Sequence, residues 1–466
     1  MKNSLFSLFL LCSIYTANAQ WIELGTGANA LNATSYINSL VLDSSGNVYV
    51  GGFFNDNSGY YYVAKWNDTA WTELGAGTDS LKANDQIYAI IIDKKGDIYA
   101  AGVFTNASGY NYVAKWDGTS WSELTGTNAL NANGNIQTLA IDNAGNIYAA
   151  GYFTNGADRT QGYEYVAKWD AATLTWSQLG IGIDTLKALS YIESLAADDS
   201  GNVYAAGNFT NSDGNYYVAK WDGAAWSELG GANALSANNW IQSITISDSG
   251  AIYAGGQFTD AGGKQYVAKW DGVAWSELGT GINALNANNT IFSITTDSAG
   301  SVYAAGWFTD VNGYSYVAKW NGTTWNELGT GANALDANNQ ILFTVVTDSG
   351  AVYAGGFFTD ANTKQYVARF QQSKQSTSGI TNITSNAVTS PATINIYPNP
   401  TSGNVTINSP EAGQVSVYSM LGELITTQPV AAGNATINLG PVPTGIYTVI
   451  VTGQSNTYTP IKIIKN

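Results

Sequence analysis

Carboxylates are the side chains of this chain best equipped for acid–base chemistry. The 466 residues contain 34 Asp and Glu and no histidine, and the single cysteine is Cys12. The lack of histidine excludes a Ser-His-Asp triad and every histidine-ligated zinc or copper site. Glycoside hydrolysis needs two carboxyl groups about 5 to 9.5 Å apart. No pair of carboxylates stands out, but Glu193, Asp184 and Asp310 are candidates for such chemistry, and the alternative is that they are solvated surface acids. We predict neither a cofactor nor a metal.

Aromatic and amide side chains occupy two positions that differ from one copy of a repeat to the next. A position that is identical in every copy serves the fold, whereas one that varies is free for function. The first variable position holds Tyr36, Gln86, Asn135, Tyr191, Trp240, Thr290 and Gln340, and the second holds Phe53, Val103, Tyr152, Asn208, Gln257, Trp307 and Phe357. Sugar-binding sites combine aromatic faces with hydrogen-bonding groups. The candidate binding residues are therefore Tyr36, Tyr152, Tyr191, Trp240 and Trp307, and side chains that only fill a central channel are the alternative.

The repeat that carries these positions is about fifty residues long and contains the core Tyr-Val-Ala-Lys-Trp. The core ends at Trp66, Trp116, Trp169, Trp221, Trp270 and Trp320, and a seventh copy ends at Phe370. Each copy reads as four strands, A to D, which in the second copy are residues 87–93, 97–104, 112–116 and 121–124. This length fits one propeller blade. The sequence therefore predicts an all-β, seven-bladed β-propeller over residues 20–370.

Strand D follows strands A, B and C only six times, although these three occur seven times. Residues 21–24, which precede the first strand A, have the pattern of the missing strand. We expect them to pair with residues 366–370 and to join the two ends of the ring, because proteins protect their open sheet edges.

Short turns join A to B and C to D, whereas longer loops join B to C and D to A. Repeated aspartates in the A-to-B turns, such as Asp43 and Asp142, are assigned to turn capping, with calcium binding as the alternative. The longer loops share one face, which we predict to be the working surface. Lysines of strand C and glutamates of strand D, such as Lys65 and Glu73, predict cross-strand ion pairs.

Charge and the first residues indicate an exported protein that does not bind nucleic acid. Residues 20–370 hold 14 Lys and Arg against 32 Asp and Glu, a balance that repels phosphate backbones. Residues 1–19 read as a secretory signal peptide, with Lys2 before an apolar run and small residues before Gln20. No segment reaches the roughly 20 apolar residues of a transmembrane helix.

A second domain follows residue 370. Residues 371–391 are rich in Ser, Thr, Asn and Gln and read as a flexible linker. Residues 392–466 alternate strand-like runs (404–407, 415–418, 435–439 and 446–451) with Gly and Pro turns. This pattern predicts a small β-sandwich.

Residues 392–466 resemble the type A C-terminal sorting domain of cargo for the type IX secretion system of Bacteroidetes. The resemblance rests on Ile396-Tyr397-Pro398-Asn399-Pro400-Thr401-Ser402-Gly403, on Pro443-Thr444-Gly445-Ile446-Tyr447, and on the basic tail Lys462-Ile463-Ile464-Lys465. The sorting-motif residues that it implies are Tyr397, Pro398, Asn399, Pro400, Gly403, Gly445, Tyr447, Lys462 and Lys465. It also implies that the type IX machinery is a partner, and that the protein is released or attached at the cell surface.

The repeats look like kelch-type or galactose-oxidase-like propeller repeats, because strand B ends in Gly-Gly at residues 51–52, 255–256 and 355–356, and a Tyr and a Trp come later in the repeat. The other four copies have Ala-Gly. The copper ligands of galactose oxidase cannot exist here without histidine. A sialidase site needs three arginines, and the repeats hold only Arg159 and Arg369. The resemblance therefore implies a fold and little chemistry.

These features together predict a non-enzymatic exported propeller that binds a glycan or a protein at the cell surface. A secreted carbohydrate-active hydrolase or lyase, using Asp, Glu or Tyr on the long-loop face, is the first alternative. A structural surface scaffold is the second. The near uniformity of the repeats argues against a specialised catalytic centre.

Overall fold

The computed structural model describes residues 20–75, 77–156, 162–347, 350–371, 395–409, 411–419, 424–440, 442–453 and 461–465. The predicted signal peptide (residues 1–19) and the predicted linker (residues 371–391, except Gln371) lie outside them. Contacts divide the chain into two units, Met1–Thr377 and Ser378–Asn466, and each is described by itself. Among the described residues, no helix combines the length and hydrophobicity that a membrane span requires.

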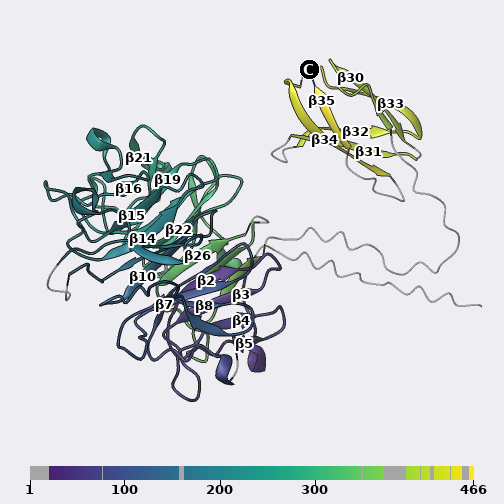
Figure 1. The fold of residues 1–466 in the computed structure, drawn as a ribbon. Helices are drawn as coiled ribbons and strands as arrows, with labels where there is room; N and C mark the ends of the chain where they lie inside the picture. Colours follow the sequence, from purple (N-terminus) through teal and green to yellow (C-terminus); the bar gives the residue numbers. More distant parts are fainter. Residues whose placement is uncertain are drawn as a thin grey trace, which may run out of the picture. The chain divides into compact units, whose positions relative to one another are not determined.

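Seven four-stranded antiparallel sheets build the described part of the first unit. The first sheet is β2 (Ile37–Leu42), β3 (Val48–Gly52), β4 (Ala64–Trp66) and β5 (Trp71–Glu73). The next five are β6 (Ile87–Ile92), β7 (Ile98–Gly102), β8 (Ala114–Trp116) and β9 (Trp121–Glu123); β10 (Ile136–Ile141), β11 (Ile147–Gly151), β12 (Ala167–Asp170) and β13 (Thr175–Gln178); β14 (Ile192–Ala197), β15 (Val203–Gly207), β16 (Ala219–Trp221) and β17 (Trp226–Glu228); β18 (Ile241–Ile246), β19 (Ile252–Gly256), β20 (Ala268–Trp270) and β21 (Trp275–Glu277); and β22 (Ile291–Thr296), β23 (Val302–Gly306), β24 (Ala318–Trp320) and β25 (Trp325–Glu327). Figure 1 shows the first strands β2, β10, β14 and β22 near the middle of this unit, and β5 and β21 at its periphery.

The seventh sheet combines both ends of the first unit. Its order is β1 (Gln20–Glu23), β28 (Ala368–Gln371), β27 (Val352–Gly356) and β26 (Ile341–Val346). β1 runs antiparallel to β28, with Trp21 opposite Phe370. β26 also contacts β2 of the first sheet. Short 3-10 helices lie in six of the loops between sheets: η1 (Gly27–Asn29), η2 (Gly77–Asp79), η3 (Gly182–Asp184), η4 (Gly231–Asn233), η5 (Gly281–Asn283) and η6 (Gly331–Asn333).

The core of the first unit lies between neighbouring sheets. The isoleucine that begins each innermost strand is fully buried, and all five residues of each second strand are buried. Between the first and second sheets, Tyr49 and Val63 pack with Ile87, Ile98 and Phe104. The sheets are thus held together by close packing of their faces.

One indole hydrogen bond also connects each sheet to the preceding one, and we call this set the indole chain. In each outer strand a tryptophan Nε1 donates to the carbonyl oxygen of the leucine that follows the outer strand of the preceding sheet, at 2.7 to 3.3 Å. The donors are Trp21, Trp71, Trp121, Trp176, Trp226, Trp275 and Trp325, and their respective acceptors are Leu328, Leu24, Leu74, Leu124, Leu179, Leu229 and Leu278.

A β-bulge interrupts the start of each innermost strand. In the first sheet, Ile37 pairs with Gly52 and Ser39 pairs with Gly51, which leaves Asn38 as the extra residue. The same register shift occurs in the other six sheets. A Cβ atom added to Gly52 would lie 2.3 Å from the Tyr36 carbonyl oxygen. This close approach explains why glycine occupies the corresponding position of all seven repeats.

Two sheets around one core form the described part of the second unit. One sheet is β29 (Asn395–Tyr397), β30 (Asn404–Ser409) and β33 (Gly433–Asn438), and the other is β32 (Leu424–Val430), β31 (Gly413–Ser419), β34 (Gly445–Gly453) and β35 (Ile461–Lys465). Val405 and Ile437 of the first sheet pack with Val417, Val449 and Ile463 of the second. Two sheets that share a core in this way form the β-sandwich that the sequence predicts.

Candidate binding site

The two variable positions lie next to each other in every sheet, and we call their fourteen residues the variable ring. In each sheet the backbone N–H of the second position donates to the carbonyl oxygen of the first, at 2.8 to 2.9 Å; Phe53 and Tyr36 form this bond in the first sheet. This hydrogen bond lies next to the β-bulge, so the bulge sets the backbone positions of both residues. The glycine before the second position holds the two segments close together. Positions that are variable in the sequence are therefore invariant in backbone geometry.

Tyr36 joins variable-ring residues from three sheets. Its aromatic ring lies 4.3 Å from that of Phe357 in the seventh sheet and 5.3 Å from that of Phe53 in the first. Its hydroxyl donates to Gln86 Oε1 of the second sheet at 2.9 Å. Phe53 also stacks on Tyr61, with ring centroids 5.5 Å apart. Aromatic and amide groups are thus brought together here, and Tyr36 is partly exposed.

Tyr152 and Tyr191 make a second aromatic contact, between the third and fourth sheets. Their ring centroids are 4.2 Å apart and the ring planes differ by 18°. Tyr152 occupies the second variable position and Tyr191 the first, which is the same pairing across sheets as Phe357 with Tyr36. The variable ring therefore continues from sheet to sheet, and both tyrosines remain partly exposed.

Trp240 and Trp307 are the tryptophans of the variable ring. Trp307 is 48% exposed, which is unusual for a tryptophan, whereas Trp240 is half-buried. Within the described residues, neither indole stacks on another aromatic ring. No described contact joins these two side chains: Trp240 holds the first position of the fifth sheet and Trp307 the second position of the sixth, which is the reverse of the arrangement of Tyr152 and Tyr191. Trp307 is the better placed of the two to stack on a ligand.

Glu193 is the extra residue of the bulge in the fourth sheet. It therefore lies in the innermost strand β14, directly after Ile192, which begins that strand. Burial raises the pKa of Glu193 to about 7, and a side-chain hydrogen bond with Gln137 opposes this rise. Burial also raises the pKa of Tyr88, the bulge residue of the second sheet, to about 12, with further contributions from Tyr36, Tyr191 and Glu193. The bulge residues form a third variable set, which the sequence analysis missed.

The other two candidate carboxylates lie elsewhere. Asp184 ends η3. Asp310 caps a loop, because its Oδ1 accepts the backbone N–H groups of Asn312 and Tyr314, each at 2.9 Å. Partial burial raises the pKa of Asp310, but these hydrogen bonds outweigh it and the net shift is downward. No described contact joins Asp184, Glu193 and Asp310.

The sorting-motif residues of the second unit converge although they are far apart in the sequence. Asn399 Oδ1 accepts the backbone N–H of Ile464 at 2.9 Å, and Thr401 forms a parallel bridge with Lys465. Lys465 is buried and pairs with Gly445 across the sheet. These contacts bring the first motif, the second motif and the basic tail together at one site.

The remaining motif residues differ in exposure. Tyr447 is buried, and its hydroxyl donates to the Pro443 carbonyl oxygen at 2.9 Å. The Gly403 carbonyl accepts the backbone N–H of Leu439 at 2.8 Å. Tyr397 is 50% exposed, and Pro398 and Pro400 are also exposed. The side chain of Lys462 lies outside the described residues. An exposed group on a rigid sandwich is suited to contact with a partner.

Several solved structures resemble the chain at low identity. They include the extracellular domain of the putative hybrid two-component system BT3049 from B. thetaiotaomicron (TM-score 0.49, 11% identity, 96% of this chain and 58% of that one) and PorZ, a surface component of the type IX secretion system of Porphyromonas gingivalis (0.41, 14%, 92% and 65%). The WD40 β-propeller domain of Doa1 is also similar (0.49, 12%, 76% and 98%). The chain thus spans less than two thirds of the first two. No curated protein matches it.

The second unit has a clear family match. Residues 395–466 match the family described as the secretion system C-terminal sorting domain. The match contains all nine sorting-motif residues, including those that converge around Lys465. The chain therefore carries a C-terminal sorting domain, which marks it as cargo of a secretion system that delivers proteins to the cell surface or beyond.

Proposed function

We propose that this protein is an exported β-propeller that binds a glycan at the cell surface without turning it over. The observation that carries the proposal is the variable ring. Its backbone geometry is the same in seven sheets, while its side chains change among aromatic, amide and aliphatic types. A rigid frame that presents different aromatic and amide groups is the usual construction of a sugar-binding surface.

The seven sheets are, in this proposal, kelch-like blades of one closed ring that β1 completes. Two observations support closure. β1 supplies the outer strand of the sheet that contains β26, and β26 contacts β2. The indole chain also runs through β1: Trp21 donates to Leu328, and Leu24, which follows β1, accepts from Trp71.

The type IX secretion machinery is the proposed partner for export. The converging motif around Lys465 would be the surface that this machinery recognises, and the mature protein would be released or attached at the cell surface. Removal of residues 392–466 should then leave the protein inside the cell envelope, as measured by immunoblotting of culture fractions.

Equilibrium binding by variants of the variable ring tests the ligand site. Trp307→Ala should weaken binding of a retained polysaccharide by about 5- to 30-fold, because the loss of one stacked aromatic ring costs about 1 to 2 kcal/mol. Tyr110→Ala is a matched control, since Tyr110 is also exposed but lies outside the variable ring. Equal effects of the two substitutions would contradict the proposed site.

A second candidate function rests on Glu193. A carboxyl group with a pKa near 7 is suited to general acid–base catalysis, and Tyr191 and Glu193 lie close enough to Tyr88 to contribute to its raised pKa. This arrangement favours a lyase over a two-carboxylate hydrolase, because no described carboxylate contributes to the pKa shift of Glu193. Product release that Glu193→Gln abolishes would support this candidate against the non-enzymatic one.

A further inference from the structure

A cavity of about 690 Å³ lies between the second and third sheets, away from the variable ring. We call it the inter-sheet cavity. The A-to-B turns of both sheets line it, as do Ser122–Thr125 beside β9 and the C-to-D turn of the third sheet. These short turns belong to the face opposite the longer loops. This cavity is therefore not on the face that the loop lengths predict.

Three departures from the repeat pattern meet at this cavity. The A-to-B turn of the second sheet is Asp93-Lys94-Lys95-Gly96, whereas the first sheet has Asp43-Ser44-Ser45-Gly46. Thr125 replaces a glycine whose counterparts Gly25, Gly75, Gly180, Gly230, Gly279 and Gly329 all have positive φ. Six residues separate Trp169 from Trp176, whereas four separate the corresponding tryptophans of the first sheet. Lys94, Lys95, Thr125 and the longer turn all line the cavity.

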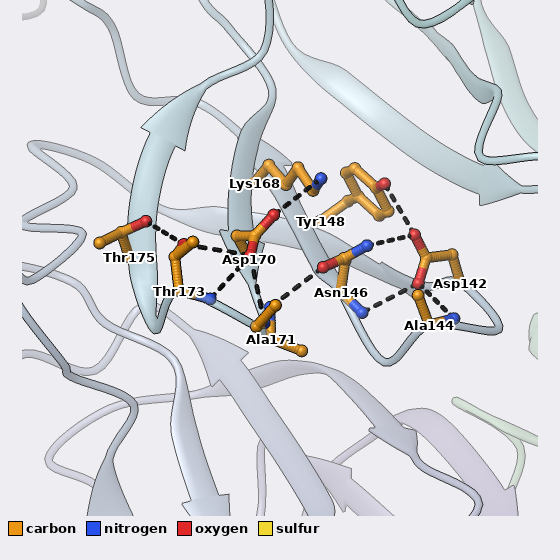
Figure 2. Close-up of polar contacts among 10 residues, drawn as sticks. Asp142, Ala144, Asn146, Tyr148, Lys168, Asp170, Ala171, Thr173 and Thr175 are labelled. Carbon is orange, nitrogen blue, oxygen red and sulfur yellow. Dashed lines mark hydrogen bonds and ion pairs between the residues drawn. The ribbon is translucent and has the colours of Figure 1, made fainter.

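The longer turn, which lines the cavity through Ala171 and Leu174, is held by the polar contacts that Figure 2 shows. Asp170 Oδ1 accepts the backbone N–H of Thr173 at 2.9 Å, and Asp170 Oδ2 lies 3.2 Å from Lys168 Nζ. These contacts lower the pKa of Asp170 to about 2. The backbone N–H of Ala171 donates to Asn146 Oδ1 of the neighbouring turn at 3.0 Å. Leu174, at the end of this turn, is 53% exposed and offers an apolar surface.

Three lysines and three carboxylates line the cavity, and among the described contacts of these six only the side chains of Lys94 and Lys95 have neither a hydrogen-bond nor an ion-pair partner; Glu123, for example, accepts from the Asn106 amide at 3.3 Å. Asp93 Oδ1 accepts the Lys95 backbone N–H at 2.8 Å and its Oδ2 accepts the Tyr99 hydroxyl at 3.2 Å. Asp142 is likewise bonded within its own turn, and Lys115 pairs with Asp97 at 2.7 Å. In the described parts of the chain, neither Lys94 nor Lys95 has an ion-pair partner. Two exposed ammonium groups therefore remain at the cavity, on a unit that is otherwise strongly acidic.

We propose that the inter-sheet cavity binds an acidic saccharide, with the ammonium groups of Lys94 and Lys95 contacting its carboxylate or sulfate group. The volume of the cavity falls in the range of small-ligand sites. Its ammonium groups can bind the charged group of an acidic sugar, while the C–H face of the same sugar can pack against the apolar side chain of Leu174. This site does not depend on the variable ring. The proposal is supported by the fact that three separate departures from the repeat sequence all line this one cavity.

Titration calorimetry of the purified protein with three oligosaccharides tests the site. The probes are trigalacturonate, which bears carboxylates, a sulfated carrageenan oligosaccharide, and cellotriose, which is neutral. We expect at least one acidic probe to bind about tenfold or more tightly than cellotriose, with an affinity that falls as salt increases. The probe that binds better identifies carboxylate or sulfate as the recognised group. Equal binding of cellotriose, or no binding of either acidic probe, would overturn the proposal.

Two double variants separate this site from general charge effects. Lys94→Ser with Lys95→Ser gives the second turn the Asp-Ser-Ser-Gly sequence of the first, so the fold should be preserved, and binding should weaken about tenfold or more. Lys82→Asn with Lys187→Asn removes the same charge at exposed positions where other repeats have Asn32, Asn131 and Asn286 at similar φ. This control should bind normally. Retained affinity in the first variant, or an equal loss in the control, would refute the role of Lys94 and Lys95.

Discussion

The indole chain shows how one side-chain atom, repeated seven times, can hold adjacent sheets together. Trp325 is buried, and its Nε1 lies 2.7 Å from the Leu278 carbonyl oxygen. A buried hydrogen bond contributes about 1 kcal/mol, and an unsatisfied buried acceptor costs about 1 to 3 kcal/mol. The tryptophans are therefore important for their N–H group as well as for their size.

Trp325→Phe should lower the free energy of unfolding by about 1 to 3 kcal/mol, because it leaves the Leu278 carbonyl without its donor. Urea denaturation would measure the change. Trp320→Phe is the matched control: its ring centroid is 5.8 Å from that of Trp325, and its indole has no described hydrogen bond. If both variants lose the same stability, the hydrogen bond is not what matters.

Glu193 makes stability depend on pH. Its pKa of about 7 in the folded protein exceeds the value near 4.3 expected for an unfolded chain. The folded state therefore binds the proton more tightly, and stability falls as pH rises between these two values. Glu193→Gln should raise the free energy of unfolding at pH 8 by up to about 3 kcal/mol and do much less at pH 4.5. Denaturant titrations at both pH values measure the two effects. An equal effect of the substitution at both pH values would contradict the pKa shift.

At the scale of elements, the fifty-residue period predicted the strands well. In the second sheet, residues 87–93 and 121–124 were expected as strands, and β6 and β9 match them to within one residue. Alternation and Gly-containing turns carry this information locally. The sequence also predicted four strands of the second unit, but not β29, β32 or β35, which lack a clear alternating pattern.

Two features could not be predicted because they depend on register. The bulge shifts the pairing at each innermost strand by one residue, and nothing local in an Ile-led strand shows it. The predicted pairing of Lys65 with Glu73 is wrong, because Lys65 lies opposite Thr72, while Glu73 lies opposite Ala64 and so points to the other face. Lys65 instead lies over the Tyr49 ring, at 5.3 Å.

The Gly-Gly version of the second strand in the seventh sheet reflects the side chain on the neighbouring strand. In the seventh sheet, Phe343 lies opposite Gly355, and a Cβ atom on Gly355 would lie 2.3 Å from the Phe343 ring. In the fourth sheet, Ser194 lies opposite Ala206. The smaller partner leaves room for a methyl group.

A double-mutant cycle tests this reading. Gly355→Ala should cost about 1 to 3 kcal/mol through overpacking when Phe343 is present. In a Phe343→Ser background, which recreates the serine–alanine pair of the fourth sheet, the same substitution should cost almost nothing. Thermal or urea unfolding of the four proteins gives the coupling. Costs that simply add would argue against steric conflict between these two positions.

At the scale of the whole molecule, β1 determines whether the first unit is one ring. Removal of residues 20–25 would expose the edge of β28 and the buried ring of Phe370, and would remove both indole-chain bonds made by this segment. We expect the melting temperature to fall by at least about 5 °C. Calorimetry of the shortened and intact proteins measures this fall, and an unchanged value would contradict closure by β1.

Glycan binding without turnover is the function that we propose for the exported protein. The most direct measurement is to incubate the purified protein with a panel of neutral and acidic polysaccharides, and to record both the protein retained and the ends released. We expect retention on at least one polysaccharide with no new reducing or unsaturated ends. Release of such ends would contradict it in favour of an enzyme, and retention on none would contradict it in favour of a protein ligand or a structural role.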